Sequence, residues 1–261
     1  MPKLAANISM LFSERPFLDR IDAAAAAGFR AVECQYPYDY PAAEFAARLA
    51  AWRLAAALIN VPPGEGEAAR GFAALPGREA EFDASLERAL AYAGAIRCHR
   101  IHVLAGRVVP TPETEAVFIA NLRRAADRAA RAQVVLTLEP LNAKDQPVYF
   151  LRTTSQAVAL LDRIGRDNVR LQFDFYHCQI TEGGLAEHAA RLHGYFGHVQ
   201  IAGVPGRHEP DCGEINYPFL LELLDRLGYD GWVGCEYRPA AGTLDGLGWA
   251  SRWGIGASRA G

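Results

Sequence analysis

VVLTLE, residues 134–139, is a short apolar run rich in β-branched residues, and it ends in a glutamate. Three later runs share this design and also end in an oxygen-bearing side chain: VRLQFD at Asp174, GHVQ at Gln200 and WVGCE at Glu236. The segments between these runs are long enough for a helix each. Parallel strands joined by helices all point the same way, so the four strand ends are expected to meet at one rim of a barrel.

The same alternation of strand-like and helix-like segments extends over the whole chain. Strands are expected near residues 3–9, 31–35, 55–60, 100–105, 134–139, 169–175, 197–202 and 231–236. Helices fit near residues 15–27, 41–52, 78–95, 113–132, 154–164, 184–193 and 216–227, with a last piece after Leu244. Eight such repeats predict an α/β fold, a single (β/α)8 TIM barrel spanning residues 1–261. An open doubly wound sheet is the competing fold, but no GxGxxG motif follows the first strand.

Composition and charge exclude several classes of function. The net charge is −3 and the Lys and Arg residues are scattered, which argues against nucleic-acid binding. Five dispersed cysteines without a CxxC pair indicate reduced thiols and a cytoplasmic protein. The N-terminus carries no secretory signal, and the apolar run at residues 23–27 is too short to cross a membrane. A homo-oligomer remains open, because barrels often pair through their helices.

Residues two apart in a strand share a face, so the four strand ends also predict the layer beneath them. If the four terminal side chains point into the barrel, so do Thr137, Gln172, His198 and Gly234. The alternate residues of these strands are apolar or cysteine, as burial against helices requires. We therefore expect a polar inner layer that supports the strand ends from below.

Three carboxylates and an amide oxygen at one rim describe a site for a hard divalent cation. An all-oxygen set formed by Glu139, Asp174, Gln200 and Glu236 favours Mg²⁺ or Mn²⁺ over Zn²⁺. The plainer alternative is that each acidic residue only caps its strand or pairs with a neighbour. A cation held here would polarise a substrate carbonyl, and Glu139 and Glu236 would act as base and acid beside it.

Several stretches resemble the hydroxypyruvate isomerase family, which belongs to the xylose isomerase-like TIM barrels together with the ketose 3-epimerases. They are LEPLN (138–142), FDFYH (173–177), HVQIAGVPGRHEPDCGEINY (198–217) and GWVGCEY (231–237), with N-terminal matches in ANISMLFSERPFLDRI, FRAVECQYPYDY and LPGREAEF. The resemblance covers nearly the whole chain. The chain departs from the usual family pattern at Gly203 and at Asp211-Cys212, in the loop after the seventh strand.

By this resemblance, Glu139 and Glu236 are the catalytic proton carriers and also metal ligands, completed by Asp174 and Gln200. His177 and Arg207 match substrate-contacting positions. The implied reaction interconverts hydroxypyruvate and tartronate semialdehyde through a cis-enediolate. A 2-oxo-tetronate isomerase, a ketose 3-epimerase and a non-catalytic sugar-acid binding barrel are the alternatives. Glutamine at position 200, where related epimerases usually carry histidine, favours the isomerases.

Three further residues are candidates for contact with a small hydroxy-keto acid. His102 ends the fourth strand, and Asn60 closes the third strand at the same rim, as Glu33 closes the second. Arg70 lies in the long loop after the third strand, where it would meet an anionic substrate. For each of these residues a packing, loop-anchoring or solvated role is the alternative. The zinc nucleases of the superfamily need more histidines and a basic groove, which this acidic chain lacks.

Overall fold

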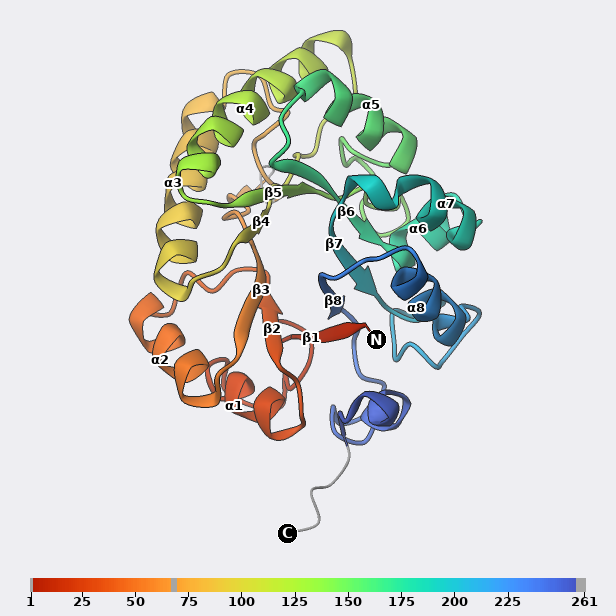
Figure 1. The fold of residues 1–261 in the computed structure, drawn as a ribbon. Coiled ribbons are helices and arrows are strands. Elements are labelled where there is room, and N and C mark those ends of the chain that lie inside the picture. The colour runs from red at the N-terminus through yellow and green to blue at the C-terminus, as the bar shows by residue number, and fades with distance from the viewer. Residues whose placement is uncertain (1, 67–69, 257–261) are drawn as a thin grey trace.

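Eight parallel strands form a closed barrel whose order in space is their order in the sequence (Figure 1). The computed structural model describes residues 2–66 and 70–256. The strands are β1 Lys3–Asn7, β2 Ala31–Cys34, β3 Ala55–Asn60, β4 Arg100–His102, β5 Val135–Leu138, β6 Val169–Asp174, β7 Phe196–Ile201 and β8 Trp232–Cys235. This barrel confirms the prediction of a (β/α)8 fold, and each strand overlaps its predicted range.

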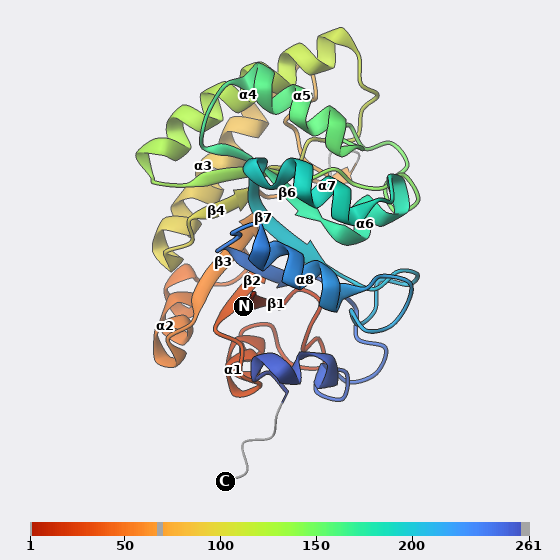
Figure 2. The same cartoon turned by 45° about the vertical axis from the view of Figure 1, so that its right-hand side comes forward.

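Helices surround the barrel and cover its outer face (Figures 1 and 2). They are α1 Asp19–Ala26, α2 Ala42–Trp52, α3 Glu79–Ile96, α4 Pro112–Arg131, α5 Thr154–Ile164, α6 Phe175–Thr181, α7 Leu185–Leu192 and α8 Tyr217–Arg226. The Thr111 side chain caps α4 by accepting a hydrogen bond from the Thr114 amide, and Thr153 caps α5 in the same way. No helix among the described residues is long and apolar enough to cross a membrane.

The short helix α6 is an element that the sequence reading missed. It begins directly after β6, where the Asp174 carboxylate accepts a hydrogen bond from the Tyr176 amide at 2.7 Å. This N-cap turns the chain into a helix before it leaves the rim. His177 consequently lies one helical turn beyond Asp174, on the same side of the barrel mouth.

The last described segment packs against α1 instead of forming a regular helix after β8. It contains the 3₁₀ helix η3, Leu247–Trp253, which lies beside α1 in both views (Figures 1 and 2). The Gly256 amide donates to the Ala27 carbonyl at 2.8 Å. Gly28 has a φ of 104°, and a Cβ there would overlap the Gly254 carbonyl oxygen. Glycine at position 28 therefore lets the turn after α1 lie directly against the backbone at the end of η3.

The barrel has an apolar outer face and a polar interior. Residues such as Leu136, Phe173 and Val199 are buried between strands and helices, as the strand parity predicts. Inside the barrel, the Thr137 hydroxyl donates to Gln172 at 2.8 Å, and both side chains are buried. The predicted polar inner layer is therefore present beneath the rim.

Candidate active site

A cavity of about 460 Å³ opens at the carboxyl ends of the strands. Of the nine predicted site residues, seven line it: Asn60, Arg70, His102, Glu139, His177, Arg207 and Glu236. Asp174 and Gln200 do not line the cavity, although both are buried at the ends of adjacent strands, β6 and β7. The strand ends and loops thus bring most of the predicted residues to one pocket, with two of the predicted ligands held deeper.

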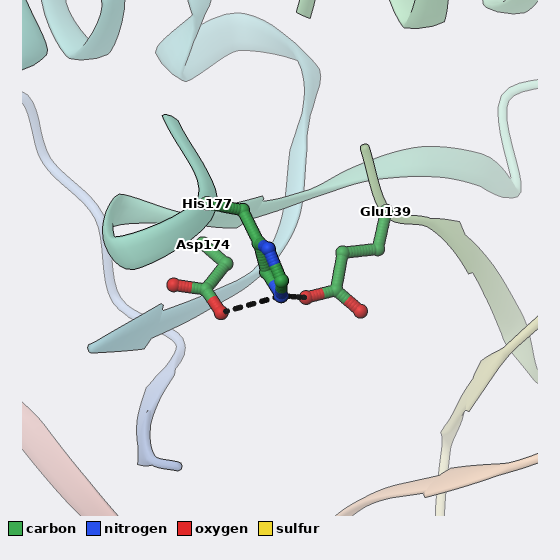
Figure 3. Close-up of side chains that lie close together, drawn as sticks. All are labelled: Glu139, Asp174 and His177. Atoms are coloured by element: carbon green, nitrogen blue, oxygen red, sulfur yellow. Dashed lines mark ion pairs between the residues drawn. The ribbon is translucent and has the colours of Figure 1, made fainter. Parts of the chain in front are cut away.

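Glu139, Asp174 and His177 form a buried cluster at the edge of this pocket (Figure 3). His177 Nε2 lies 3.9 Å from Glu139 Oε1 and 3.8 Å from Asp174 Oδ2. Among the described residues, neither of these two carboxylate oxygens has a hydrogen-bond partner. Buried carboxylate oxygens without donors are costly unless a cation or a proton compensates them. Their arrangement fits a divalent cation.

The pKa values of the carboxyl groups support the same interpretation. Burial raises the pKa of Glu139 well above its ordinary value, and the nearby Glu236 and Asp174 carboxylates raise it further. Burial raises the pKa of Asp174 to about 7, although the Arg207 guanidinium opposes the shift. Burial also raises the pKa of Glu236, again against the effect of Arg207. Without a cation, this site therefore holds protons that the carboxyl groups would otherwise lose.

His177 is held as a hydrogen-bond donor toward this cluster. Its Nδ1 accepts a hydrogen bond from the Asn142 backbone amide at 3.1 Å, and the Asn142 side-chain nitrogen lies 2.7 Å from the same atom. Burial lowers the pKa of His177 well below its ordinary value, so the ring is neutral. A neutral ring that accepts at Nδ1 carries its hydrogen on Nε2, the atom facing Glu139 and Asp174. A protonated nitrogen binds an oxygen rather than a cation, which suits contact with substrate.

His102 is a neutral residue of the pocket wall. Burial lowers its pKa to about 3. Its Nδ1 lies 3.5 Å from Glu139 Oε2, and neither ring nitrogen has a hydrogen-bond partner among the residues that the structure describes. An imidazole with two free buried nitrogens is available to a bound molecule.

Glu236 is held by donors from three parts of the barrel. Arg207 Nη2 donates to Oε2 at 2.6 Å, and Gln35 and Asn7 donate to Oε1 at 2.9 and 3.2 Å. The same Arg207 nitrogen lies 3.7 Å from Asp174 Oδ2, and the guanidinium stacks over the Tyr176 ring at 4.9 Å. Arg207 therefore supplies positive charge between two of the predicted ligands. The sequence predicted neither Asn7 nor Gln35 as a site residue, since each acts through a contact with a strand far away in the sequence.

Gln200 is connected to Glu139 through Gln172. The Gln172 side-chain nitrogen donates to Gln200 Oε1 at 2.7 Å and to Glu139 Oε2 at 3.1 Å. The Gln200 carbonyl oxygen and Glu139 Oε2 thus share one donor, the Gln172 side-chain nitrogen.

Another part of the cavity wall is cationic and polar. Arg70 Nε donates to Gln146 at 3.0 Å, and the Tyr36 hydroxyl hydrogen-bonds with both Arg70 and Asn60. Lys144 also lines the cavity, in the loop after β5. Neither Tyr36 nor Lys144 was predicted from the sequence as a site residue. Residues 67–69, which precede Arg70 in the same loop, lie outside the described residues.

The sequence of this chain is similar to that of a known protein family. Its sequence matches the xylose isomerase-like TIM barrel family over residues 21–253. The chain belongs to this family. The predicted resemblance to xylose isomerase-like barrels is therefore confirmed over most of the length of the protein.

Relatives within the xylose isomerase-like family are named as isomerases. The 2-oxo-tetronate isomerase of Cupriavidus necator is 53% identical over 253 residues, which cover 95% of this chain and 97% of the relative. The hydroxypyruvate isomerase of Escherichia coli is 41% identical over 253 residues, covering 95% of this chain and 98% of the relative. These relatives confirm the prediction that this xylose isomerase-like barrel is an isomerase.

A solved structure from Brucella melitensis, described as an AP endonuclease of family 2, has the same fold with a TM-score of 0.94. It is 45% identical and covers 97% of this chain and 99% of its own. This xylose isomerase-like chain therefore shares its fold with a relative whose crystal structure has been solved.

The two departures from the usual family pattern contact each other in the loop after β7. A Cβ on Gly203 would overlap the backbone carbonyl oxygens of Cys212 and Glu209. The Gly203 carbonyl accepts from the Arg207 amide at 3.0 Å, and Arg207 has a positive φ of 59°. The tight loop that positions Arg207 in this xylose isomerase-like barrel thus leaves no room for a side chain at position 203.

A pH-dependent loss of stability is expected for the metal-free protein. The folded-state pKa of Asp174, about 7, lies above its ordinary value of 3.8, so the folded protein binds this proton more tightly than the unfolded chain. Its contribution is full below the ordinary pKa and is lost as pH rises through the folded pKa. The free energy of unfolding in EDTA, measured by urea denaturation, should therefore fall by at most a few kcal/mol across this window. An Asp174→Asn variant should show a shallower decline, and an equally steep one would contradict the assignment.

Proposed function

We propose that this protein is a metal-dependent isomerase of a small hydroxy-keto acid, and that its substrate is a 2-oxo-tetronate. The observation that carries the proposal is the joining, in one pocket, of a buried acidic cluster with a cationic wall. The choice of a four-carbon acid is supported by the relatives, because the Cupriavidus necator 2-oxo-tetronate isomerase shares more sequence than the E. coli hydroxypyruvate isomerase. Hydroxypyruvate is the second candidate.

Glu139, Asp174, Gln200 and Glu236 would hold the divalent cation, Mg²⁺ or Mn²⁺. The unpaired oxygens of Glu139 and Asp174 and the all-oxygen donor set support this assignment. When bound, such a cation supplies Lewis acidity that polarises a carbonyl oxygen and stabilises negative charge beside it. His177 is set apart from the ligands because its Nε2 carries a hydrogen.

The residues of the chain itself would move the protons. Glu139 and Glu236 reach the cavity from β5 and β8, which lie in different parts of the barrel wall. One of them removes the proton from the hydroxyl-bearing carbon beside the carbonyl, which gives a cis-enediolate. A glutamate then returns a proton to the former carbonyl carbon, and the hydroxyl proton passes to the former carbonyl oxygen, so that the neighbouring carbon becomes the carbonyl. The His177 Nε2–H would donate a hydrogen bond to a substrate oxygen during these steps.

Arg70 and Lys144 would bind the carboxylate of the acid. Both line the cavity, and Gln146 and Tyr36 hold the Arg70 side chain in the cavity wall. Arg207 is less suited to this role than the sequence suggested, because Glu236 already occupies its Nη2. A cationic wall favours a sugar acid over a neutral ketose, since desolvated cations without an anion are costly.

Replacement of Arg70 by methionine should raise KM for the acid by about 10- to 100-fold, because a charge-assisted hydrogen bond contributes about 1.5–3 kcal/mol. The value of kcat should change much less, since Arg70 contacts neither proton carrier. Steady-state kinetics with 2-oxo-tetronate measure both constants. Arg88→Met removes a cation that stacks on Tyr38 and serves as the matched control, with an expected KM near that of the wild type. An unchanged KM in Arg70→Met would contradict the role of the wall.

The substrate assignment is tested by direct comparison. Purified enzyme with Mn²⁺ or Mg²⁺ is assayed on 2-oxo-tetronate, hydroxypyruvate and a free ketose under identical conditions. The highest kcat/KM is expected for 2-oxo-tetronate. Faster turnover of the free ketose would indicate an epimerase, and no turnover of any substrate would indicate a binding protein.

No observation favours an endonuclease. The multi-zinc chemistry of abasic-site nucleases needs several histidine ligands. Within residues 2–66 and 70–256, the one cluster of His, Cys, Asp and Glu side chains with metal-ligand spacing contains a single histidine. The function of the Brucella melitensis relative is therefore not transferred to this chain.

A further inference from the structure

A buried glutamate lies at the centre of the polar layer under the pocket, and the reaction proposed above does not use it. Glu33 was expected at the rim, but its side chain is fully buried inside the barrel. The register of β2 with β1 is regular, and the extra residue in its pairing with β3, Ala57, lies on β3. Glu33 therefore shares a face with Ala31, two residues before it, which packs against Ala5 and Ala57. This ordinary alternation directs the Glu33 carboxylate toward the barrel axis.

Three donors from other strands converge on the Glu33 carboxylate. Asn7 and Gln200 donate their side-chain N–H groups to Oε1 at 2.9 and 2.8 Å, and His198 Nε2 lies 2.6 Å from Oε2. Position 234 on β8 is glycine, and a Cβ there would overlap both carboxylate oxygens. The barrel thus provides both the partners and the space for this one acidic group.

The chemistry of a carboxylate determines which way the Gln200 amide points. An ionised carboxylate only accepts hydrogen bonds, so Gln200 must present its nitrogen to Glu33. The Gln200 carbonyl oxygen then points away from Glu33, toward the Gln172 side-chain nitrogen, which also donates to Glu139 Oε2. An amide side chain is otherwise free to turn over, because its two ends have nearly the same shape.

We propose that Glu33 is a positioning residue that orients the Gln200 amide, so that the Gln200 carbonyl oxygen faces the cation site. This inference rests on the proposed metal-dependent function. Glu33 itself contacts neither substrate nor metal, and its effect on metal affinity is transmitted through Gln200. A second contact runs through Asn7, which donates to Glu33 and Glu236 from one nitrogen and accepts from the Ser9 amide at 3.1 Å.

The test is the affinity for Mn²⁺ itself, measured by isothermal titration calorimetry without substrate. A Glu33→Gln side chain places an NH₂ group where the carboxylate accepted hydrogen bonds. The Gln200 amide nitrogen then loses its acceptor, and the Gln200 amide loses its fixed orientation. The dissociation constant for Mn²⁺ should rise by about 10- to 100-fold, as is usual when a group supporting a metal ligand is replaced. Kinetically, the Mn²⁺ concentration for half-activation should rise, while KM for 2-oxo-tetronate stays near the wild-type value.

A double-mutant cycle with Gln200→Met separates positioning from a general structural role. If Glu33 acts through Gln200, adding Glu33→Gln to Gln200→Met should weaken Mn²⁺ binding no further. A further loss equal to that in the wild-type background would overturn the proposal. Glu209→Gln is the matched control, because Glu209 is a buried glutamate that binds the Ala240 amide outside the inner layer. Its Mn²⁺ affinity should equal that of the wild type.

Two other results would separate a failure of the proposed function from a failure of the proposed role of Glu33. Wild-type protein that binds no Mn²⁺ would overturn both the proposed function and this inference. If the Glu33→Gln protein binds Mn²⁺ as tightly as the wild type, the positioning role of Glu33 is overturned and the proposed function is not. Thermal melting in EDTA checks that each variant folds. Should Glu33→Gln not fold, Glu33→Asp, which withdraws the carboxylate by one methylene, replaces it in the same cycle.

Discussion

A Glu236→Gln enzyme is expected to lose about 10²- to 10⁴-fold in kcat, the usual contribution of a general acid or base. Glutamine keeps the size of the side chain and can still accept a hydrogen bond at its carbonyl oxygen. It cannot carry a proton between the two carbons of the substrate. Arg207, Gln35 and Asn7 all donate to this carboxylate. A glutamine keeps such bonds only at its carbonyl oxygen and turns its NH₂ group toward a donor, so the expected loss includes a change in position.

The measurement has to separate proton transfer from metal binding, because Glu236 is also a proposed ligand. Turnover is measured at saturating Mn²⁺, and exchange of the substrate C–H in D₂O is followed by NMR. Both should fall together if Glu236 carries the proton. Glu182→Gln, which changes a glutamate bonded to Thr154, should retain wild-type kcat. Full turnover by Glu236→Gln would show that this residue is not a proton carrier.

Removal of the divalent cation should reduce activity by at least about 10²- to 10³-fold, because Lewis-acid stabilisation contributes several kcal/mol to the barrier. Three carboxyl groups with raised pKa values cannot all remain ionised in a buried site without a cation. In the metal-free enzyme they take up protons, and the proposed bases are no longer available.

Dialysis against EDTA followed by assay measures this effect. Mg²⁺ or Mn²⁺ should restore activity, whereas Zn²⁺ should restore less, since the four proposed ligands offer only oxygen atoms. Circular dichroism before and after dialysis checks that the fold persists. An enzyme shown by elemental analysis to be free of metal, yet fully active, would contradict the proposed cation requirement.

The sequence was sufficient for the barrel and for the residues at its rim. Alternation of strands and helices predicts parallel strands, and parallel strands place all their carboxyl ends together. For this reason Glu139 and Glu236 could be assigned to one pocket although they lie far apart in the chain. Strand parity likewise predicted the buried partners Thr137 and Gln172, because alternate residues share a face.

The sequence was insufficient where a side chain takes its role from a contact outside its own strand. Glu33 was expected at the rim, but its side chain lies in the interior, where donors from β1 and β7 bind it. Helix α6 was missed, and with it the reason why His177 faces Asp174. Arg207 was expected to contact substrate, and the structure shows in addition that it pairs with Glu236 through a loop that has no room for a side chain at position 203.

By itself, then, the order of residues determined the fold, the family and the set of oxygen-bearing side chains at the rim, since periodicity and strand direction are local properties. Only the tertiary structure decided which atom of each side chain faces the cluster. The hydrogen on His177 Nε2 follows from the Asn142 amide, and the orientation of Gln200 follows from Glu33. Both depend on hydrogen bonds between segments far apart in sequence, whose donors and acceptors meet only when the barrel closes.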